Sequence, residues 1–228
     1  MSNSLKTGNF KVIIFDMDGV LIDSEPAYKV MNMEHFSELG FKMYENEYDG
    51  YVGMSSLRMW DRIKTKYSLN QSVEELMSSE KVRMYKVLSS DLISKPIDGI
   101  KELIDSFNKK NYRLCVASSS PKDNIKLVLD RHSLEKHFDF IVSGEEVANG
   151  KPSPDIFFKV SDHFQSSSDN CYVIEDSFNG VSAAKAAGMK CIGFRNLNSG
   201  MQDISKADLI ISSFSKTEID NILKFIED

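Results

Sequence analysis

The chain alternates between short, mostly apolar runs and longer segments in which apolar residues recur every three or four positions. The apolar runs cover residues 11–15, 112–117, 138–142, 171–174, 190–194 and 207–211. A run without polar alternation predicts a strand that is buried on both faces, as in a parallel sheet. Periodic segments lie between them at 99–109, 121–131 and 155–164. They predict helices, the second of which has Pro121 at its first helical position.

Strand, helix and strand in this rhythm predict an α/β fold, a doubly wound, Rossmann-like parallel sheet with helices on both faces. Residues 25–94 break the rhythm, because they contain no convincing buried strand. Their helical patterns lie near 27–39, 55–66 and 73–89. We therefore expect a core formed by residues 1–24 and 95–228 and a small α-helical cap domain inserted at 25–94.

The composition of the 228 residues is typical of a globular protein, with 41% hydrophobic and 27% charged residues. Lys and Arg number 28 against 34 Asp and Glu, which gives a net charge of −6. An acidic surface repels nucleic acid and anionic membranes, so we expect no partner of either kind. No apolar stretch approaches the ~20 residues that span a bilayer, and residues 1–9 lack the apolar segment of a secretory signal.

The three cysteines, Cys115, Cys171 and Cys191, lie in separate apolar runs and form no CxxC pair. This spacing predicts buried, reduced thiols. Together with the missing signal segment it predicts a cytoplasmic protein, which we expect to be a monomer.

Polar residues follow four of the predicted strands. They are Asp16 and Asp18 after the first, Ser118, Ser119 and Ser120 after the second, Lys151 beyond the third, and Glu175, Asp176 and Ser177 after the fourth. Parallel sheets bind ligands at the carboxyl ends of their strands. We therefore expect these side chains to meet in one site.

Each group also has a simpler structural interpretation when it is taken alone. Asp18-Gly19 is a common turn signal, and the serines before Pro121 are suited to cap a helix. Lys151 is compatible with a solvated surface position, and Glu175-Asp176 with an acidic helix start. The simpler interpretations require four independent coincidences at four strand ends. One shared site explains all four groups, so we favour the site.

Four motifs in this order resemble those of the haloacid dehalogenase superfamily. The first, FDMDGVLIDSEP at residues 15–26, is similar to the signature of its phosphatase branch that is related to beta-phosphoglucomutase. The others are VAS at 116–118, GKPSPD at 150–155, and VIEDS at 173–177 with Gly180 and residues 183–188. The resemblance covers nearly the whole chain, including a helical cap, and says little about the substrate.

The resemblance implies a Mg²⁺-dependent phosphatase that acts on a small phosphorylated metabolite, for which a sugar phosphate is one candidate. Asp16 would be the nucleophile that forms an aspartyl-phosphate, and Asp18 the general acid and base. Family members bind Mg²⁺ through positions that match Asp16, the Asp18 carbonyl, Glu175 and Asp176. Oxygen ligands suit Mg²⁺, and the sequence has no His or Cys cluster that suggests zinc.

The resemblance also implies phosphate-binding groups. Ser118 and Lys151 would assist catalysis, and these two residues and Ser119 would bind the phosphate, because Lys151 and Mg²⁺ neutralise the nearby carboxylates. In the mutase-like branch a cap lysine contacts the substrate phosphate, and Lys81 aligns loosely with it. A solvated position on the helix predicted at 73–89 suits Lys81 equally well.

A beta-phosphoglucomutase-like phosphomutase is the alternative function. Mutases of that type carry a His in the first cap helix where Tyr28 stands. They also carry an Arg shortly after the glycine that matches Gly53, where this chain has Ser56, with Arg58 two residues on. Both departures favour hydrolysis. Asp18 argues against halide chemistry, because dehalogenases lack the second acid. The third hypothesis is a catalytically inactive binding protein, and the complete set of chemical positions argues against it.

Overall fold

The computed structural model describes residues 10–93 and 95–228. Six parallel strands form one sheet in the order β3-β2-β1-β4-β5-β6. The strands are β1 (Val12–Phe15), β2 (Arg113–Ser118), β3 (Phe140–Ser143), β4 (Cys171–Glu175), β5 (Lys190–Phe194) and β6 (Leu209–Ile211). The predicted α/β parallel-sheet fold is confirmed, and each predicted strand is present with ends that differ by at most two residues.

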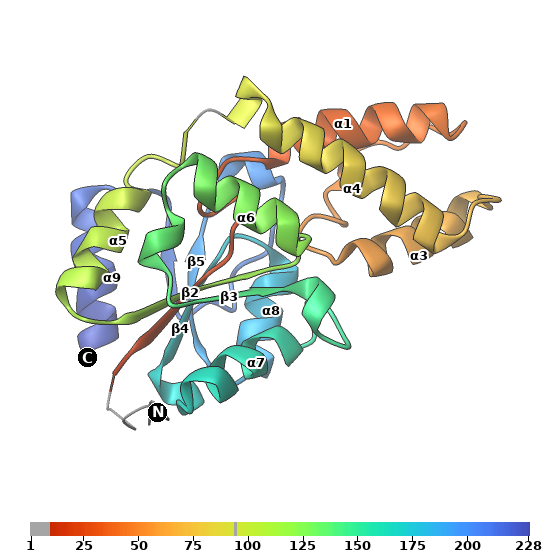
Figure 1. Cartoon of the computed structure of the whole chain (residues 1–228). Coiled ribbons are helices and arrows are strands. Elements are labelled where there is room, and N and C mark those ends of the chain that lie inside the picture. Colours follow the sequence, from red (N-terminus) through yellow and green to blue (C-terminus); the bar gives the residue numbers. More distant parts are fainter. Residues whose placement is uncertain (1–9, 94) are drawn as a thin grey trace, which may run out of the picture.

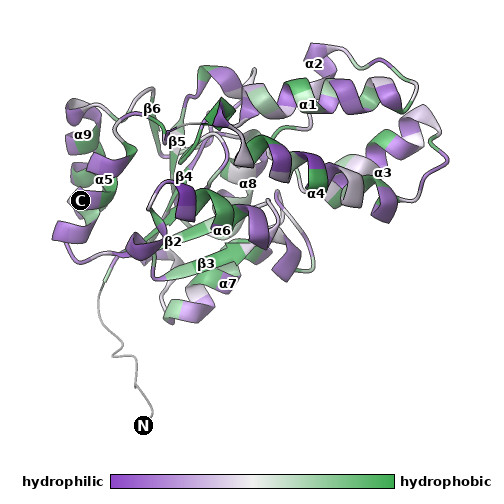
Figure 2. Cartoon of the chain, turned by 45° about the horizontal axis from the view of Figure 1, so that its top comes forward, coloured by the Kyte–Doolittle hydropathy of each residue, from purple (hydrophilic) through white to green (hydrophobic). Residues whose placement is uncertain are grey.

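Helices cover both faces of this sheet (Figure 1). They are α5 (Ile100–Lys109), α6 (Lys122–Arg131), α7 (Asp155–Phe164), α8 (Phe178–Ala186) and α9 (Lys216–Glu227). Side chains of β1 alternate between two apolar layers. Ile13 and Phe15 pack with residues of α5, α6 and α9, whereas Val12 and Ile14 pack with residues of α7 and α8. Both faces are apolar, as the green strands in Figure 2 show, and this explains the lack of polar alternation.

The strand order reverses at β1, which is bordered by β2 on one side and by β4 on the other. At such a switch point the chain leaves neighbouring strands in opposite directions, which opens a crevice at their carboxyl ends. Asp16 and Glu175 stand at this edge, at the ends of β1 and β4.

The chain between β1 and α5 forms helices that stand beside the sheet at the upper right of Figure 1. They are α1 (Glu25–Glu38), α2 (Glu45–Tyr48), α3 (Ser56–Tyr67) and α4 (Val73–Ser89). They enclose an apolar cluster of their own around Phe36, Trp60 and Ile63. Tyr28 of α1 and Met84 of α4 join the main core instead, so the inserted helices are packed against the sheet domain.

The short 3₁₀ helices lie in the connecting loops. They are η1 (Asp91–Ile93), η2 (Glu135–His137), η3 (Gly144–Glu146), η4 (Ser168–Asn170) and η5 (Leu197–Ser199). The predicted division into core and cap stays a prediction, and its residues 1–9 and 94 lie outside the described residues. The prediction about a signal segment at 1–9 lies outside them as well.

Several helix details differ from the sequence pattern. Helices α2, α8 and α9 are not among the helices predicted from the sequence. Five of the nine residues of α8 are Gly, Ala or Ser, whose small side chains give little amphipathic contrast. Pro121 precedes the first residue of α6 instead of occupying it, and no serine side chain caps this helix. The prediction of a serine cap is therefore wrong, because the serines make other bonds.

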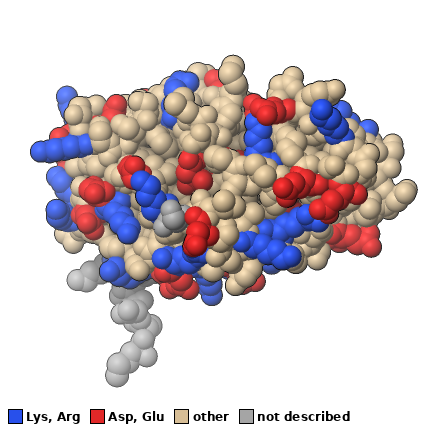
Figure 3. Space-filling model, turned by 90° about the horizontal axis from the view of Figure 1, so that it is seen from above, with Lys and Arg blue, Asp and Glu red and all other residues tan. Residues whose placement is uncertain are grey.

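The cysteines, the surface charge and the character of the helices can also be compared with the sequence predictions. All three cysteines are buried and free, as predicted. Basic and acidic side chains are interspersed on the face that Figure 3 shows. In the described part of the chain, no helix combines the length and the apolar character that crossing a membrane requires.

Candidate active site

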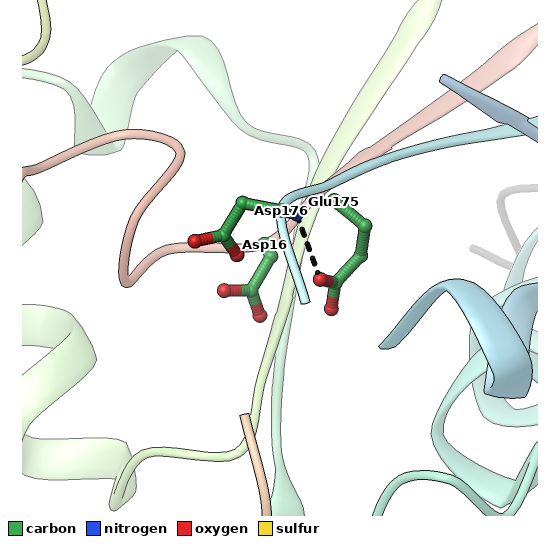
Figure 4. A group of neighbouring side chains, drawn as sticks. All are labelled: Asp16, Glu175 and Asp176. Atoms are coloured by element: carbon green, nitrogen blue, oxygen red, sulfur yellow. Dashed lines mark hydrogen bonds between the residues drawn. The ribbon is translucent and has the colours of Figure 1, made fainter. Parts of the chain in front are cut away.

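Three carboxylates meet at the ends of β1 and β4. One oxygen each of Asp16, Glu175 and Asp176 lies within 4.8 Å of the others, and all three residues are buried. Figure 4 shows the side chains gathered at this edge of the sheet. The backbone of β1 is fixed here, because the Asp16 amide donates to the Ile174 carbonyl at 3.0 Å. The structure thus brings together residues that are about 160 positions apart in the sequence.

Lys151 lies among these carboxylates and is 2% exposed. Its Nζ donates to Asp16 Oδ1 at 2.6 Å, to Glu175 Oε1 at 2.7 Å and to the Ala117 carbonyl at 3.0 Å. Burial lowers the pKa of Lys151, but the two carboxylates outweigh it and raise the pKa above the ordinary value. Lys151 is therefore a permanent buried cation, and the solvated surface position is excluded.

Glu175 and Asp176 are oriented by their own loop. Glu175 Oε2 accepts from the Asp176 and Ser177 amides at 3.0 and 3.1 Å and from Ser177 Oγ at 3.0 Å. Asp176 Oδ2 accepts a short hydrogen bond from Ser199 Oγ. A side chain at Gly180 would overlap the Glu175 carboxylate, which explains the glycine in the first turn of α8.

Asp18 faces the same pocket from the turn that follows β1. Its Oδ1 accepts from Ser24 Oγ and its Oδ2 from Ser120 Oγ, both at 2.6 Å. Burial raises the pKa of Asp18, and these two hydroxyl donors oppose the rise. A carboxyl group with a raised pKa that is held in one orientation is suited to donate and accept a proton.

Ser118 and Ser119 line the pocket at the end of β2. The Ser118 hydroxyl is buried and accepts from the Ser120 amide at 3.1 Å. The structure therefore places both predicted phosphate-binding serines beside Asp16, Asp18 and Lys151.

Lys81 lies apart from these groups. It does not line the pocket, and its Nζ lies 3.1 Å from Glu145 and 3.9 Å from Asp123, on the outside of the junction between α4 and the core. Arg58 is also exposed and does not line the pocket. In this structure neither cation reaches the site.

Several pocket residues were not singled out from the sequence. Glu25, Asn32, Tyr48 and Glu80 all line the pocket and are buried. Burial, with a further contribution from the charge of Asp18, raises the pKa of Glu25 to about 8. The cavity between the inserted helices and the core measures about 80 Å³. This is far below the roughly 300–1,000 Å³ of typical ligand pockets, so the inserted helices here are closed over the site.

The comparisons with known proteins agree with this geometry. The family model described as haloacid dehalogenase-like hydrolase matches residues 13–194. This range begins in β1, ends with β5 and includes every carboxylate described above. The chain belongs to the haloacid dehalogenase-like hydrolase family.

Curated members of this family are similar over nearly the full chain. A phosphorylated carbohydrates phosphatase of Thermotoga maritima is 30% identical over 216 residues, which cover 94% of this chain and 98% of that protein. The beta-phosphoglucomutase of Bacillus subtilis is 32% identical over 213 residues and 90% of each chain. Together with the family match, these relatives support the prediction of an enzyme, a phosphoric monoester hydrolase.

A solved structure of the family confirms the fold. The beta-phosphoglucomutase of Clostridium difficile superimposes with a TM-score of 0.82 at 25% identity, over 96% of this chain and 97% of that one.

Haloacid dehalogenase-like enzymes generally use Mg²⁺, and the residues of this chain fit the ion. Burial raises the pKa of Asp16 to about 8 and, together with the charge of Glu175, raises the pKa of Asp176 well above its ordinary value. Three carboxylates with one lysine leave excess negative charge, which a divalent cation would balance. Asp16 and Asp176, with Glu175, supply the hard oxygen ligands that Mg²⁺ prefers.

Proposed function

We propose that the protein is a Mg²⁺-dependent phosphatase that hydrolyses a small phosphorylated metabolite, with phosphorylated carbohydrates as the substrate class. The observation that carries the proposal is the placement of Asp16 and Asp18 in one closed pocket, the first paired with Lys151 and the second held by two hydroxyl groups. The carbohydrate class comes from the named activity of the Thermotoga maritima relative.

In the first half of the proposed reaction, a carboxylate oxygen of Asp16 attacks phosphorus. The Asp16 O–P bond forms while the bond from phosphorus to the leaving oxygen breaks, and Asp18 gives its proton to that oxygen. The product alcohol leaves, and the phosphoryl group stays on Asp16. Ser118 and the backbone amides near it bind the phosphoryl oxygens, while Lys151 offsets their charge.

In the second half, Asp18 has lost its proton and acts as the base. It takes a proton from water as the water oxygen attacks phosphorus, and the Asp16 O–P bond breaks. Asp16 returns to its carboxylate, Asp18 is protonated again, and inorganic phosphate leaves. Bound Mg²⁺ would polarise the phosphoryl oxygens and screen their charge from Asp16. Asp16, Glu175, Asp176 and the Asp18 carbonyl would hold it.

The inserted helices act in this proposal as a cap. With a cavity of about 80 Å³ they must move away from the core to admit a substrate and close again to exclude water. The closed position is held by contacts such as Asn179 Nδ2 to the Val52 carbonyl at 3.1 Å and Lys81 to Glu145. We also propose that the protein is a monomer and that it acts in the cytoplasm. We expect it to bind neither nucleic acid nor membranes.

We expect turnover to require Mg²⁺ and Asp176→Asn to raise the half-saturating Mg²⁺ concentration at least ~10-fold. The substitution keeps an acceptor for Ser199 and removes one charge from the ion's ligands. Phosphate release measured against Mg²⁺ concentration tests this, with the exposed Asp220→Asn as the matched control. Full turnover of the dialysed protein in excess EDTA would contradict the proposal and leave the carboxylates a structural role.

The similarity to beta-phosphoglucomutases makes a phosphomutase the second candidate. We expect phosphate release from beta-glucose-1-phosphate to exceed glucose-6-phosphate formation, when the bisphosphate is added as primer. A mutase must hold both ends of the sugar while the phosphoryl group waits on Asp16. Tyr28 and Ser56 replace the His and Arg of the mutase branch, and Arg58 is turned to solvent. Much faster formation of glucose-6-phosphate would establish the mutase instead.

A further inference from the structure

The pocket has a second polar end, which the inserted helices form and which the mechanism above does not use. Glu80 of α4, Asn32 of α1 and Tyr48 of α2 line it, and each is at most 5% exposed. A buried carboxylate costs stability unless hydrogen bonds or a charged partner compensate it. Glu80 therefore calls for an explanation beyond packing.

Hydrogen bonds within the inserted helices fix the direction of Glu80. Trp60 Nε1 of α3 donates to Glu80 Oε2 at 2.9 Å. The Ser56 hydroxyl, also of α3, lowers the pKa of this carboxyl group, against the larger effect of burial. No lysine or arginine forms an ion pair with Glu80 among the described residues. The carboxylate is thus held as an oriented hydrogen-bond acceptor at the wall of the pocket.

Two neighbouring polar atoms are buried without a partner. Asn32 Nδ2 donates to the Tyr48 hydroxyl at 2.9 Å, but Asn32 Oδ1 has no hydrogen-bond partner in the described part of the chain. The Tyr28 hydroxyl near Asp18 makes no hydrogen bond of normal geometry either. Buried polar groups are nearly always satisfied by protein, water or ligand. The two residues that carry these atoms line the pocket, and their unsatisfied groups point to a polar ligand.

The charges of the pocket restrict what this ligand can carry. Lys151 is the one basic side chain among the described residues that line it, and Asp16 and Glu175 already occupy Lys151. A second phosphate or a carboxylate on the substrate would approach Glu25 and Glu80 without a cation to pair with. Like charges repel strongly in a closed, desolvated pocket. A hydroxyl group, in contrast, donates to such acceptors.

We infer that the substrate carries a single phosphate and that its leaving group is an uncharged, hydroxyl-rich chain whose hydroxyls donate to Glu80 and to Asn32 Oδ1. This inference rests on the proposed phosphatase function and assigns the substrate class of the same pocket. The Tyr28 hydroxyl, which lies near Asp18, is placed to form a hydrogen bond with the leaving oxygen of the substrate. Glu80 selects the substrate by accepting a hydrogen bond from a hydroxyl group and by repelling a second anionic group.

Two substrates that differ at one end test the inference. Sorbitol 6-phosphate and 6-phosphogluconate share a six-carbon chain and one phosphate, but the first ends in a hydroxymethyl group and the second in a carboxylate. Burial raises the pKa of Glu80 to about 7, so the assay at pH 8 keeps this side chain ionised. With Mg²⁺ present, we expect kcat/KM for sorbitol 6-phosphate to be at least ~10-fold higher.

The variant Glu80→Gln connects this preference to one side chain. Gln keeps an acceptor for Trp60 Nε1 but removes the charge, so the ratio of the two kcat/KM values should fall to about 3 or less. The matched control is Glu74→Gln, since Glu74 is exposed in the first turn of the same helix, and its ratio should match wild type.

Each outcome bears on a separate claim. Equal hydrolysis of both esters by wild type would overturn the inference and leave the phosphatase proposal intact. A preserved ratio in folded Glu80→Gln would overturn the role of Glu80. Hydrolysis of no phosphate ester at all would overturn the proposed function, and the inference with it. The wild-type comparison decides the substrate class even if Glu80→Gln does not fold.

Discussion

Replacement of Asp16 by Asn is expected to lower kcat for phosphate release by about 10⁴-fold or more. The amide is nearly isosteric, and its oxygen still accepts a hydrogen bond from Lys151 Nζ, which lies 2.6 Å from Asp16 Oδ1. It is, however, a poor nucleophile, and Asp18, the other carboxylate that follows β1, is held by Ser24 and Ser120. We therefore expect a loss of chemistry without a loss of fold.

Phosphate release in single-turnover and steady-state assays measures this effect, and circular dichroism and thermal unfolding check the fold. The exposed Asp98→Asn, whose side chain pairs only with Lys95 at the surface, serves as the control. Trapping of ³²P on wild type but not on Asp16→Asn would identify the phosphorylated residue. Activity of Asp16→Asn within ~10-fold of wild type would remove Asp16 from the role of nucleophile.

The sheet could be predicted from the sequence because each strand is buried on two faces. The run from Val12 to Phe15 contains no polar residue, since alternate side chains enter different apolar layers. The edge strand β6 is shorter than its predicted range, because its pairing with β5 begins only at Leu209. Helix α9 has Ile219, Ile222 and Ile226 at helical spacing, a signal that the sequence carries.

The catalytic centre could be predicted for the same topological reason. Strand ends converge at one edge of a parallel sheet, so Asp16, Glu175 and Asp176 meet there. Lys151 reaches them from the loop between β3 and α7. The partners of Asp18 were harder to foresee. Ser24 and Ser120 lie six and 102 positions away from it, and either serine alone is an ordinary helix-capping residue.

The position of Glu80 in the pocket could have been predicted from the sequence, but attention to the family motifs led elsewhere. Leu76, Glu80, Met84 and Leu88 follow one another at four-residue spacing on α4, and all four are buried. This stripe places Glu80 on the inward face and Lys81 beside it, facing Glu145. A glutamate on an apolar stripe was the informative feature, whereas the alignment with a family lysine pointed to the neighbouring residue.

Loss of the buried lysine should be the most costly single change for folding. We expect Lys151→Met to lower the free energy of unfolding by about 3–5 kcal/mol in the absence of Mg²⁺, because Asp16 and Glu175 are left buried without a cation. Met fills most of the space of the aliphatic chain, so the effect isolates the charge. Phosphate release should fall by at least ~10³-fold, since the carboxylates then repel the substrate.

Urea unfolding of Lys151→Met with and without Mg²⁺ measures the change in the free energy of unfolding. Added Mg²⁺ should stabilise Lys151→Met, since it brings positive charge to the same carboxylates. The control is Lys159→Met, which removes an exposed pair with Glu146 at 3.2 Å and should cost about 0–1 kcal/mol. If Lys151→Met and Lys159→Met were equally stable in EDTA, the buried Asp16 and Glu175 carboxyl groups would not need a cation in the folded protein, and Lys151 would not be the partner that compensates their burial.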